Sequence, residues 1–209
     1  MTGTVRWPEF WKLPKSRIYF SVGIGCMVLM FITVFFTLRF VEQRPGFIIE
    51  TWAKELLGSP INFSIGIFGI TYFSIVFAIS EHARRPVTFL QMLIAYSFMQ
   101  ISKCVLLLLV PLDPPVDILP LSDPILENAF YGGNVNLKDL FFSGHVATVF
   151  IAGVFTRTRT MKFVFLLLGI ALSFMLAQQR VHYIADVIAA PFFAWLAFKA
   201  SSPVSRSLS

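Results

Sequence analysis

The sequence predicts an all-α fold: a polytopic membrane protein built as a six-transmembrane-helix bundle with both termini cytosolic. Two properties of its composition point this way. Of the 209 residues, 56% are hydrophobic and only 13% are charged, and the mean hydropathy is +0.76. Ordinary soluble domains carry about 25% charged residues. The third observation is a set of long apolar runs, because crossing about 30 Å of hydrocarbon takes roughly 20 apolar residues.

Six apolar runs are candidate spans, and they leave room for one integral membrane domain, residues 18–200, and no soluble one. Residues 1–17 precede it as a cytosolic segment, and residues 201–209 follow it as a cytosolic tail. The fourth and fifth runs are short and are joined by the basic turn TRTRTMK, which predicts a helical hairpin. The spans are expected at about 18–38, 61–80, 87–110, 141–157, 161–178 and 182–200.

The basic residues predict the topology, because cytosolic loops of membrane proteins collect Lys and Arg. With the N-terminus inside, eleven of the seventeen basic residues fall on the cytosolic side. His145 and His182 each open a span that starts from the opposite face, so we expect both at the same depth. His82 falls on the cytosolic side and is expected to be an exposed loop histidine. The face that carries His145 and His182 would be periplasmic, lumenal or extracellular.

His182 and Asp186 stand four residues apart in the stretch QQRVHYIADVIAA. On a helix, this spacing places both side chains on one face. The aspartate would accept a proton from one imidazole nitrogen and leave the other as a nucleophile or base. Ionisable residues inside a span are functional candidates by default. The alternative is a pair that only satisfies itself within the bundle.

The stretch DLFFSGHVATVF (139–150) places Ser143, Gly144 and His145 where the fourth helix begins. Free backbone N–H groups and the helix dipole make a helix start an anion site. Gly144 lets a phosphate approach the backbone closely, and Ser143 adds a hydroxyl donor. His145 is placed to give a proton to a leaving oxygen, although a polar residue snorkelling at the interface is the alternative.

A bound phosphate also needs a cation, and three basic residues are candidates. Lys103 lies in the outer half of the third span, Lys138 in the loop before the fourth, and Arg180 just before His182. The sequence contains no Cys, His and carboxylate cluster with the spacing of metal ligands, so we expect neither a metal nor another cofactor.

Together these residues resemble the type 2 phosphatidic acid phosphatase superfamily, and more closely its sphingomyelin synthase branch. KDLFFSGH is similar to the branch motif G-D-x-x-F-S-G-H, and HYIADV is similar to H-Y-T-x-D-V. The resemblance covers about residues 61–200, and it implies supporting roles for Asp139 and Tyr183. Some positions depart from the superfamily: Leu176 and Ala78 stand where its phosphatases carry an arginine and a lysine. Lys138 replaces the glycine before the motif aspartate.

The resemblance implies a lipid head-group phosphotransferase with accompanying phospholipase C-type hydrolysis. His182, oriented by Asp186, would attack the phosphorus of a phospholipid, and His145 would protonate the departing diacylglycerol. A lipid alcohol acceptor such as ceramide, or water, would then take the head group from a phospho-histidine-type intermediate. Two alternatives stay open, a lipid phosphate phosphatase and a non-catalytic lipid-binding membrane scaffold. The expected partners are lipids of the bilayer and no nucleic acid, and the oligomeric state is left open.

Overall fold

The computed structural model describes residues 5–49, 53–122 and 136–208, and these parts of the chain are helical with no strand. An isolated bridge joins Phe47 and Leu112. The all-α fold class is therefore confirmed. The helices are α1 (Trp7–Phe10), α2 (Ser16–Gln43), α3 (Ala53–Leu57), α4 (Ser64–His82), α5 (Pro86–Leu109), α7 (Gly144–Phe155), α8 (Arg159–Gln178) and α9 (Ile184–Ser207).

Five of these helices, α2, α4, α5, α8 and α9, are long and apolar enough to cross a membrane. This confirms the prediction of a multi-pass membrane protein. The helix expected at 141–157 is shorter than predicted, because α7 has 12 residues and rises only about 18 Å at 1.5 Å per residue. Ser143 ends it on one side as the N-cap, and Thr156 ends it on the other with extended backbone angles.

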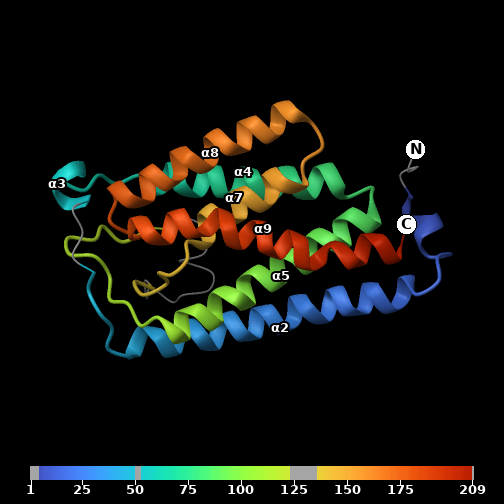
Figure 1. The fold of residues 1–209 in the computed structure, drawn as a ribbon, viewed down its shortest axis with the longest axis horizontal. Helices are drawn as coiled ribbons and strands as arrows, with labels where there is room; N and C mark the ends of the chain where they lie inside the picture. The colour runs from blue at the N-terminus through green and yellow to red at the C-terminus, as the bar shows by residue number, and fades with distance from the viewer. Residues whose placement is uncertain (1–4, 50–52, 123–135, 209) are drawn as a thin grey trace.

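Helix α7 lies at the centre of the bundle, which explains how so short a helix is stabilised (Figure 1). It packs against α4, α5, α8 and α9, and eight of its twelve residues are buried. Helix α2 is peripheral and packs along α5. Its outward face carries exposed Phe31, Phe36 and Phe40, which suits contact with lipid chains. The apolar core is therefore centred on α7, and the side chains at its start are held by the surrounding helices.

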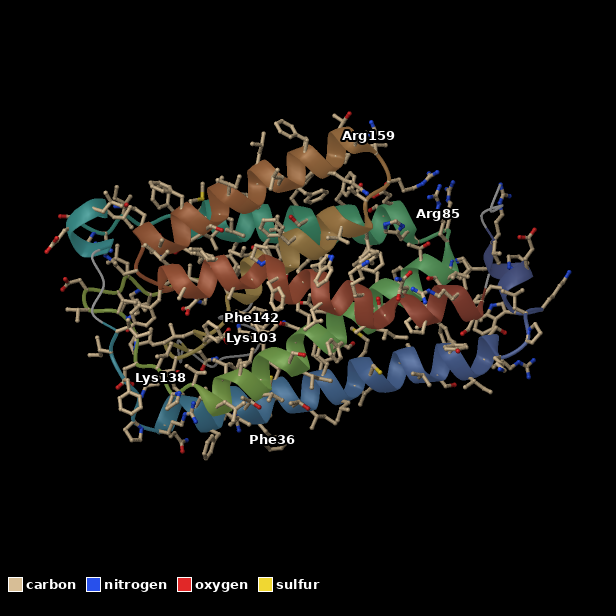
Figure 2. All side chains as sticks on the ribbon, in the orientation of Figure 1. Phe36, Arg85, Lys103, Lys138, Phe142 and Arg159 are labelled. Atoms are coloured by element: carbon tan, nitrogen blue, oxygen red, sulfur yellow. The ribbon has the colours of Figure 1, made fainter. Side chains whose placement is uncertain are left out.

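The two ends of the bundle differ in character. Both chain termini lie at one end, together with the α4–α5 and α7–α8 turns (Figure 1). Arg85 and Arg159, from these two turns, lie at that same end (Figure 2). The opposite end holds α3 and the first residues of α4 and α9, and α7 begins farther inside the bundle on that side. The basic turns therefore lie at the end of the bundle that holds the two termini.

His82 is not the exposed loop histidine that the sequence predicts. It is the last residue of α4, is 1% exposed and packs edge-to-face against the ring of Phe155, with the centroids 6.4 Å apart. The neighbouring Glu81 explains this burial. Its carboxylate accepts a hydrogen bond from the Thr156 hydroxyl at 2.8 Å and another from the Arg157 N–H at 3.2 Å. These bonds bring the α7–α8 turn over the end of α4.

At the other end, the segment that follows α2 is fastened to the end of α5. The Phe47 N–H donates to the Pro111 carbonyl at 2.8 Å, and the Asp113 N–H donates to the Phe47 carbonyl at 2.9 Å. A Cβ on Gly46 would lie 2.5 Å from the Leu112 carbonyl carbon, so this approach of two backbones requires glycine. The Arg44 guanidinium donates to the carbonyls of Leu107 and Leu108, which satisfies acceptors that the end of a helix leaves unpaired.

Candidate active site

The two motifs that the sequence singles out are in direct contact. The backbone N–H of Ser143, the N-cap of α7, donates to the backbone carbonyl of Asp186 at 3.1 Å. Asp186 lies in the first turn of α9. The hydrogen bond therefore fixes the start of α7 against the start of α9, although the two residues are far apart in the sequence.

His182 and Asp186 form a buried pair. The His182 Nδ1 and the Asp186 Oδ2 are 3.2 Å apart, and Asp186 is 0% exposed. Its Oδ2 also accepts a hydrogen bond from the Tyr183 N–H at 3.0 Å. Helix α9 begins at Ile184 rather than at 182 as predicted, so the pair does not share a helix face. A capping interaction of the first helical turn brings the two side chains together instead.

The position of Asp186 decides which nitrogen of His182 can react. A carboxylate beside Nδ1 favours the tautomer with the proton on Nδ1. Nε2 then keeps its lone pair and is the nitrogen available as a nucleophile or base. The carboxylate is itself held by the Tyr183 N–H and by the positive end of the α9 dipole.

The start of α7 has the features of an anion site. Ser143 is fully buried, and its Oγ accepts a long hydrogen bond from the Val146 N–H at 3.5 Å. Because the oxygen acts as an acceptor here, the hydroxyl proton can still be donated to a ligand. His145 follows in the first turn of α7, partly buried, with its ring edge-to-face with Phe68 at 5.6 Å.

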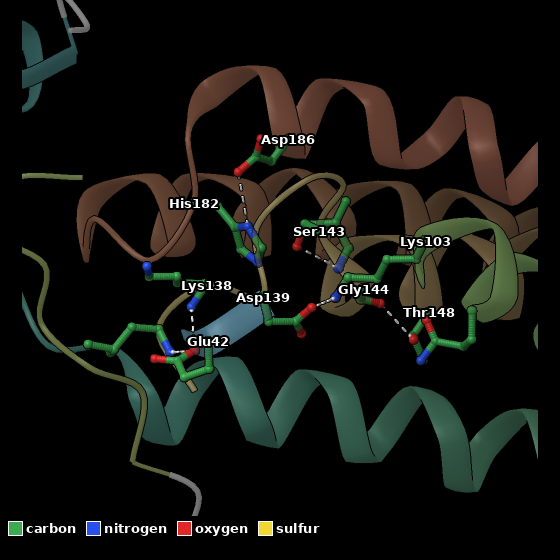
Figure 3. A network of polar contacts seen from close by, with 12 residues as sticks. Glu42, Lys103, Lys138, Asp139, Ser143, Gly144, Thr148, His182 and Asp186 are labelled. Atoms are coloured by element: carbon green, nitrogen blue, oxygen red, sulfur yellow. Dashed lines mark hydrogen bonds and ion pairs between the residues drawn. The ribbon is translucent and has the colours of Figure 1, made fainter. Parts of the chain in front are cut away.

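Lys103 lies directly against this helix start. A Cβ built on Gly144 would lie 2.9 Å from the Lys103 Nζ, so the ammonium group occupies the space that any other residue would fill. Lys103 is 6% exposed, and its Nζ forms an ion pair with the Asp139 Oδ1 at 2.6 Å. Figure 3 shows the lysine reaching from α5 to Gly144, with Asp139 beside it.

The other two predicted phosphate ligands contact the loops. The Lys138 Nζ lies 2.7 Å from the Asp113 Oδ1 and donates to the Arg44 carbonyl at 2.6 Å. Arg180, in the turn between α8 and α9, donates to the Gly58 carbonyl at 2.9 Å. Of the three candidate cations, Lys103 is therefore the one found at the start of α7.

Asp139 faces the positive groups of the site. Burial opposes ionisation of its carboxyl group, but the Lys103 ammonium, with smaller contributions from His182 and His145, outweighs this effect. The pKa of Asp139 therefore lies below its ordinary value of 3.8. The carboxylate is ionised at neutral pH, and it is close enough to both imidazoles for their charges to affect it.

Tyr183 connects this centre to the surrounding loops. Its hydroxyl donates to the Asp113 carbonyl at 2.8 Å and accepts a hydrogen bond from the Ile49 N–H at 3.2 Å. The Lys138 side chain lowers the pKa of the Asp113 carboxyl group through a hydrogen bond, against the effect of burial. Hydrogen bonds to two loops therefore hold Tyr183, the residue that follows His182, in its position.

Several residues that hold the site in place were not predicted. Gln179 is fully buried. Its amide donates to the Ser64 Oγ at 3.0 Å and to the Leu119 carbonyl at 3.1 Å, and it accepts from the Phe63 N–H at 2.7 Å. Glu42 accepts hydrogen bonds from the Leu137 and Lys138 N–H groups, both at 3.1 Å. The consecutive amides Gln178 and Gln179, placed between apolar segments, are the signal that could have found the first of these.

The described residues contain no group of three or more His, Cys, Asp or Glu side chains arranged to hold a metal ion. No protein-family model, curated protein or solved structure matches the chain. The site itself combines a buried His–Asp pair with a helix start that carries a serine, a glycine and a second histidine, and the ammonium of Lys103 from α5 lies against that start.

Proposed function

We propose that the chain is an integral membrane lipid head-group phosphotransferase, similar to sphingomyelin synthase, with accompanying phospholipase C-type hydrolysis. The observation that carries this proposal is the 3.1 Å hydrogen bond between the Ser143 N–H and the Asp186 carbonyl. It joins an anion-binding helix start to a His–Asp pair. A structural pair that only satisfies itself has no need for an anion site fastened beside it.

In the first step, the His182 Nε2 attacks the phosphorus of a phospholipid. A P–N bond forms, and the bond between the phosphorus and the diacylglycerol oxygen breaks. His145 gives its proton to that oxygen, so diacylglycerol leaves as a neutral alcohol. The head group remains on His182 as a phospho-histidine. Asp186 stabilises the positive charge that develops on the imidazole ring.

In the second step, a lipid alcohol or water takes the head group. His145, now neutral, removes the hydroxyl proton of the acceptor, and the acceptor oxygen attacks the phosphorus. The P–N bond breaks, and both histidines return to their initial state. Transfer to a lipid alcohol gives a new phospholipid, and transfer to water gives the phospholipase C-type product.

The phosphate is stabilised by groups that are in place before the substrate arrives. The start of α7, the Ser143 hydroxyl and the Lys103 ammonium lie together, with the ammonium against Gly144. Fixed donors of this kind stabilise charge that develops in a transition state, because they need little reorganisation. Phosphatases of the resembled superfamily rely on more cations, so the single lysine at the helix start supports a phosphodiester substrate over a phosphomonoester.

We propose a six-span topology, with α7 as the sixth crossing helix at the centre of the bundle. The termini would be cytosolic and the site would face the opposite side. The basic α4–α5 and α7–α8 turns beside the termini support this assignment.

The topology is tested by chemical labelling of single cysteines, introduced into a protein from which Cys26 and Cys104 have been removed. Val116→Cys, at an exposed position of the site end, should react only from the non-cytosolic side. Thr160→Cys, at the basic end, should react only from the cytosol.

The function is tested with purified protein and labelled phosphatidylcholine, phosphatidylethanolamine and phosphatidic acid, each with and without ceramide. We expect transfer to ceramide, and release of diacylglycerol when ceramide is absent. His182→Ala should abolish both, while His82→Gln, a change of the histidine at the opposite end, should abolish neither. Release of phosphate from phosphatidic acid alone would indicate a phosphatase. Absence of turnover with every lipid would contradict the proposal.

A further inference from the structure

A carboxylate of the chain itself lies where the substrate phosphate is expected to bind. The Asp139 Oδ1 is 2.6 Å from the Lys103 Nζ, and this ammonium lies against Gly144 at the start of α7. In Figure 3, Asp139 lies between the His182 ring and Lys103. The charge of Asp139 also interacts with that of His182 and His145. An incoming phosphate must therefore share its cation with a carboxylate that is already there.

The charges around this position indicate how much negative charge a bound phosphate could bring. Lys103 contributes one positive charge, and His145 in its acid form contributes a second. The negative charge of the Asp139 carboxylate cancels one of these two positive charges. Asp186 lies behind the His182 ring, bound to Nδ1, and it is balanced when that ring becomes positive. Together, Lys103, His145 in its acid form and Asp139 therefore carry a net charge of about +1, which is enough to balance a phosphodiester.

We infer that Asp139 is a specificity-determining residue that excludes doubly charged phosphate groups and admits singly charged phosphodiesters. The inference rests on the proposed function, because it concerns the phosphate that His182 attacks. Phosphomonoesters carry a charge of about −1.5 to −2 at pH 7. The second charge would lie within a few ångströms of the Asp139 carboxylate, in a partly buried position where solvent screens repulsion poorly. Phosphatidic acid and inorganic phosphate would therefore bind weakly.

The same geometry explains why removal of the charge should be tolerated. An asparagine at position 139 keeps the size of the side chain, and its oxygen can still accept a hydrogen bond from the Lys103 ammonium. Lys103 would then carry a charge that is no longer cancelled. The site would gain one positive charge without losing a residue that contacts the phosphate.

The test measures the binding of two small anions to the full-length protein in lipid nanodiscs. Binding is detected as a ligand-dependent rise of the unfolding temperature. Sulfate carries two negative charges, and dimethyl phosphate carries one. The wild-type protein should bind dimethyl phosphate more tightly than sulfate. Asp139→Asn should strengthen sulfate binding about ten-fold or more, since one like charge is removed at close range, and should change dimethyl phosphate binding much less.

Asp113→Asn is the matched control. Asp113 forms an ion pair of nearly the same length, 2.7 Å, with Lys138 at the same end of the bundle. This variant should leave the affinity for sulfate unchanged. An equal gain from Asp113→Asn would show that Lys138 is the cation that binds the anion, and the inference would be wrong. It would also be wrong if the wild-type protein preferred sulfate, a comparison that needs no variant to fold.

Binding without turnover separates this inference from the proposed function. A gain of sulfate binding in Asp139→Asn, in a protein that transfers no head group, would support the charge selection and contradict the phosphotransferase. Head-group transfer that depends on His182, without any gain of sulfate binding in Asp139→Asn, would support the enzyme and overturn the role of Asp139.

Discussion

Replacing Asp186 with asparagine tests the central pair with the smallest possible change. The Asp186 Oδ2 accepts hydrogen bonds from the His182 Nδ1 at 3.2 Å and from the Tyr183 N–H at 3.0 Å. Asparagine has the same size, and with its amide oxygen at the Oδ2 position it can still accept from both Tyr183 and Nδ1. It cannot carry the negative charge that stabilises a positive His182 ring.

The size of the effect follows from the charge that His182 acquires. In the proposed mechanism, the ring becomes positive when Nε2 bonds to phosphorus, and it then lies beside the Asp186 carboxylate. At the observed separation of 3.2 Å and an effective dielectric constant of about 20, the Coulomb energy is about 5 kcal/mol. Both side chains are buried, so solvent reduces this value little. Each 1.36 kcal/mol is worth a factor of ten in rate, so Asp186→Asn should lower kcat by about a thousandfold or more.

The assay measures initial rates of head-group transfer and, in parallel, thermal unfolding. Burying a carboxylate is costly, so the asparagine variant should unfold at the wild-type temperature or above it. Loss of activity with unchanged stability is the expected result. A rate within ten-fold of wild type would show that the Asp186 charge does not stabilise the reacting His182 ring. So would a loss of activity that only follows an equal loss of folded protein, because the pair would then be structural.

Three further predictions follow from single contacts. In Gly144→Ala the new Cβ would lie 2.9 Å from the Lys103 Nζ. The flexible lysine should move away, so turnover should fall about ten-fold with little change in unfolding temperature. Gln179→Ala leaves the Phe63 N–H without its acceptor and should cost about 2–3 kcal/mol of unfolding free energy. Gln91→Ala, which removes only a long 3.4 Å bond to Ser201, should cost less. Because the folded-state pKa of Asp139 lies below 3.8, its ion pair contributes stability that is complete above that value and is lost as the pH falls through the lowered pKa. Unfolding temperatures recorded down to about pH 2 should therefore fall more steeply for wild type than for Asp139→Asn.

The long helices could be predicted from the sequence, because the length of an apolar run directly reflects the thickness of a bilayer. The extent of α7 could not. Its ends are set by tertiary contacts, from the Ser143 N–H to the Asp186 carbonyl at one end and from the Thr156 hydroxyl to Glu81 at the other. The same Glu81 contacts bury His82, which a count of loops and charges places in solvent. Hydropathy carries no information about such contacts.

The candidate site was predictable only in part, for a similar reason. Counting spans and charges places His145 and His182 at one end of the bundle, because both open helices that start from the same side. The choice among Lys103, Lys138 and Arg180 depends on how α5 packs beside α7, and no local pattern encodes that packing. The sequence also gives Asp139 only a supporting role, since its contact with Lys103 joins two segments that are distant in the chain.

The proposed mechanism is tested most directly by detection of the covalent intermediate on His182. Protein is mixed with a panel of head-group-labelled phospholipids without an acceptor alcohol, quenched rapidly and analysed by mass spectrometry of the peptide that contains residues 178–186. The wild-type peptide should carry the mass of the phosphorylated head group on His182, and the His182→Ala peptide should lack it. Head-group transfer that continues in His182→Ala, or a label found on a different residue, would contradict the proposed mechanism.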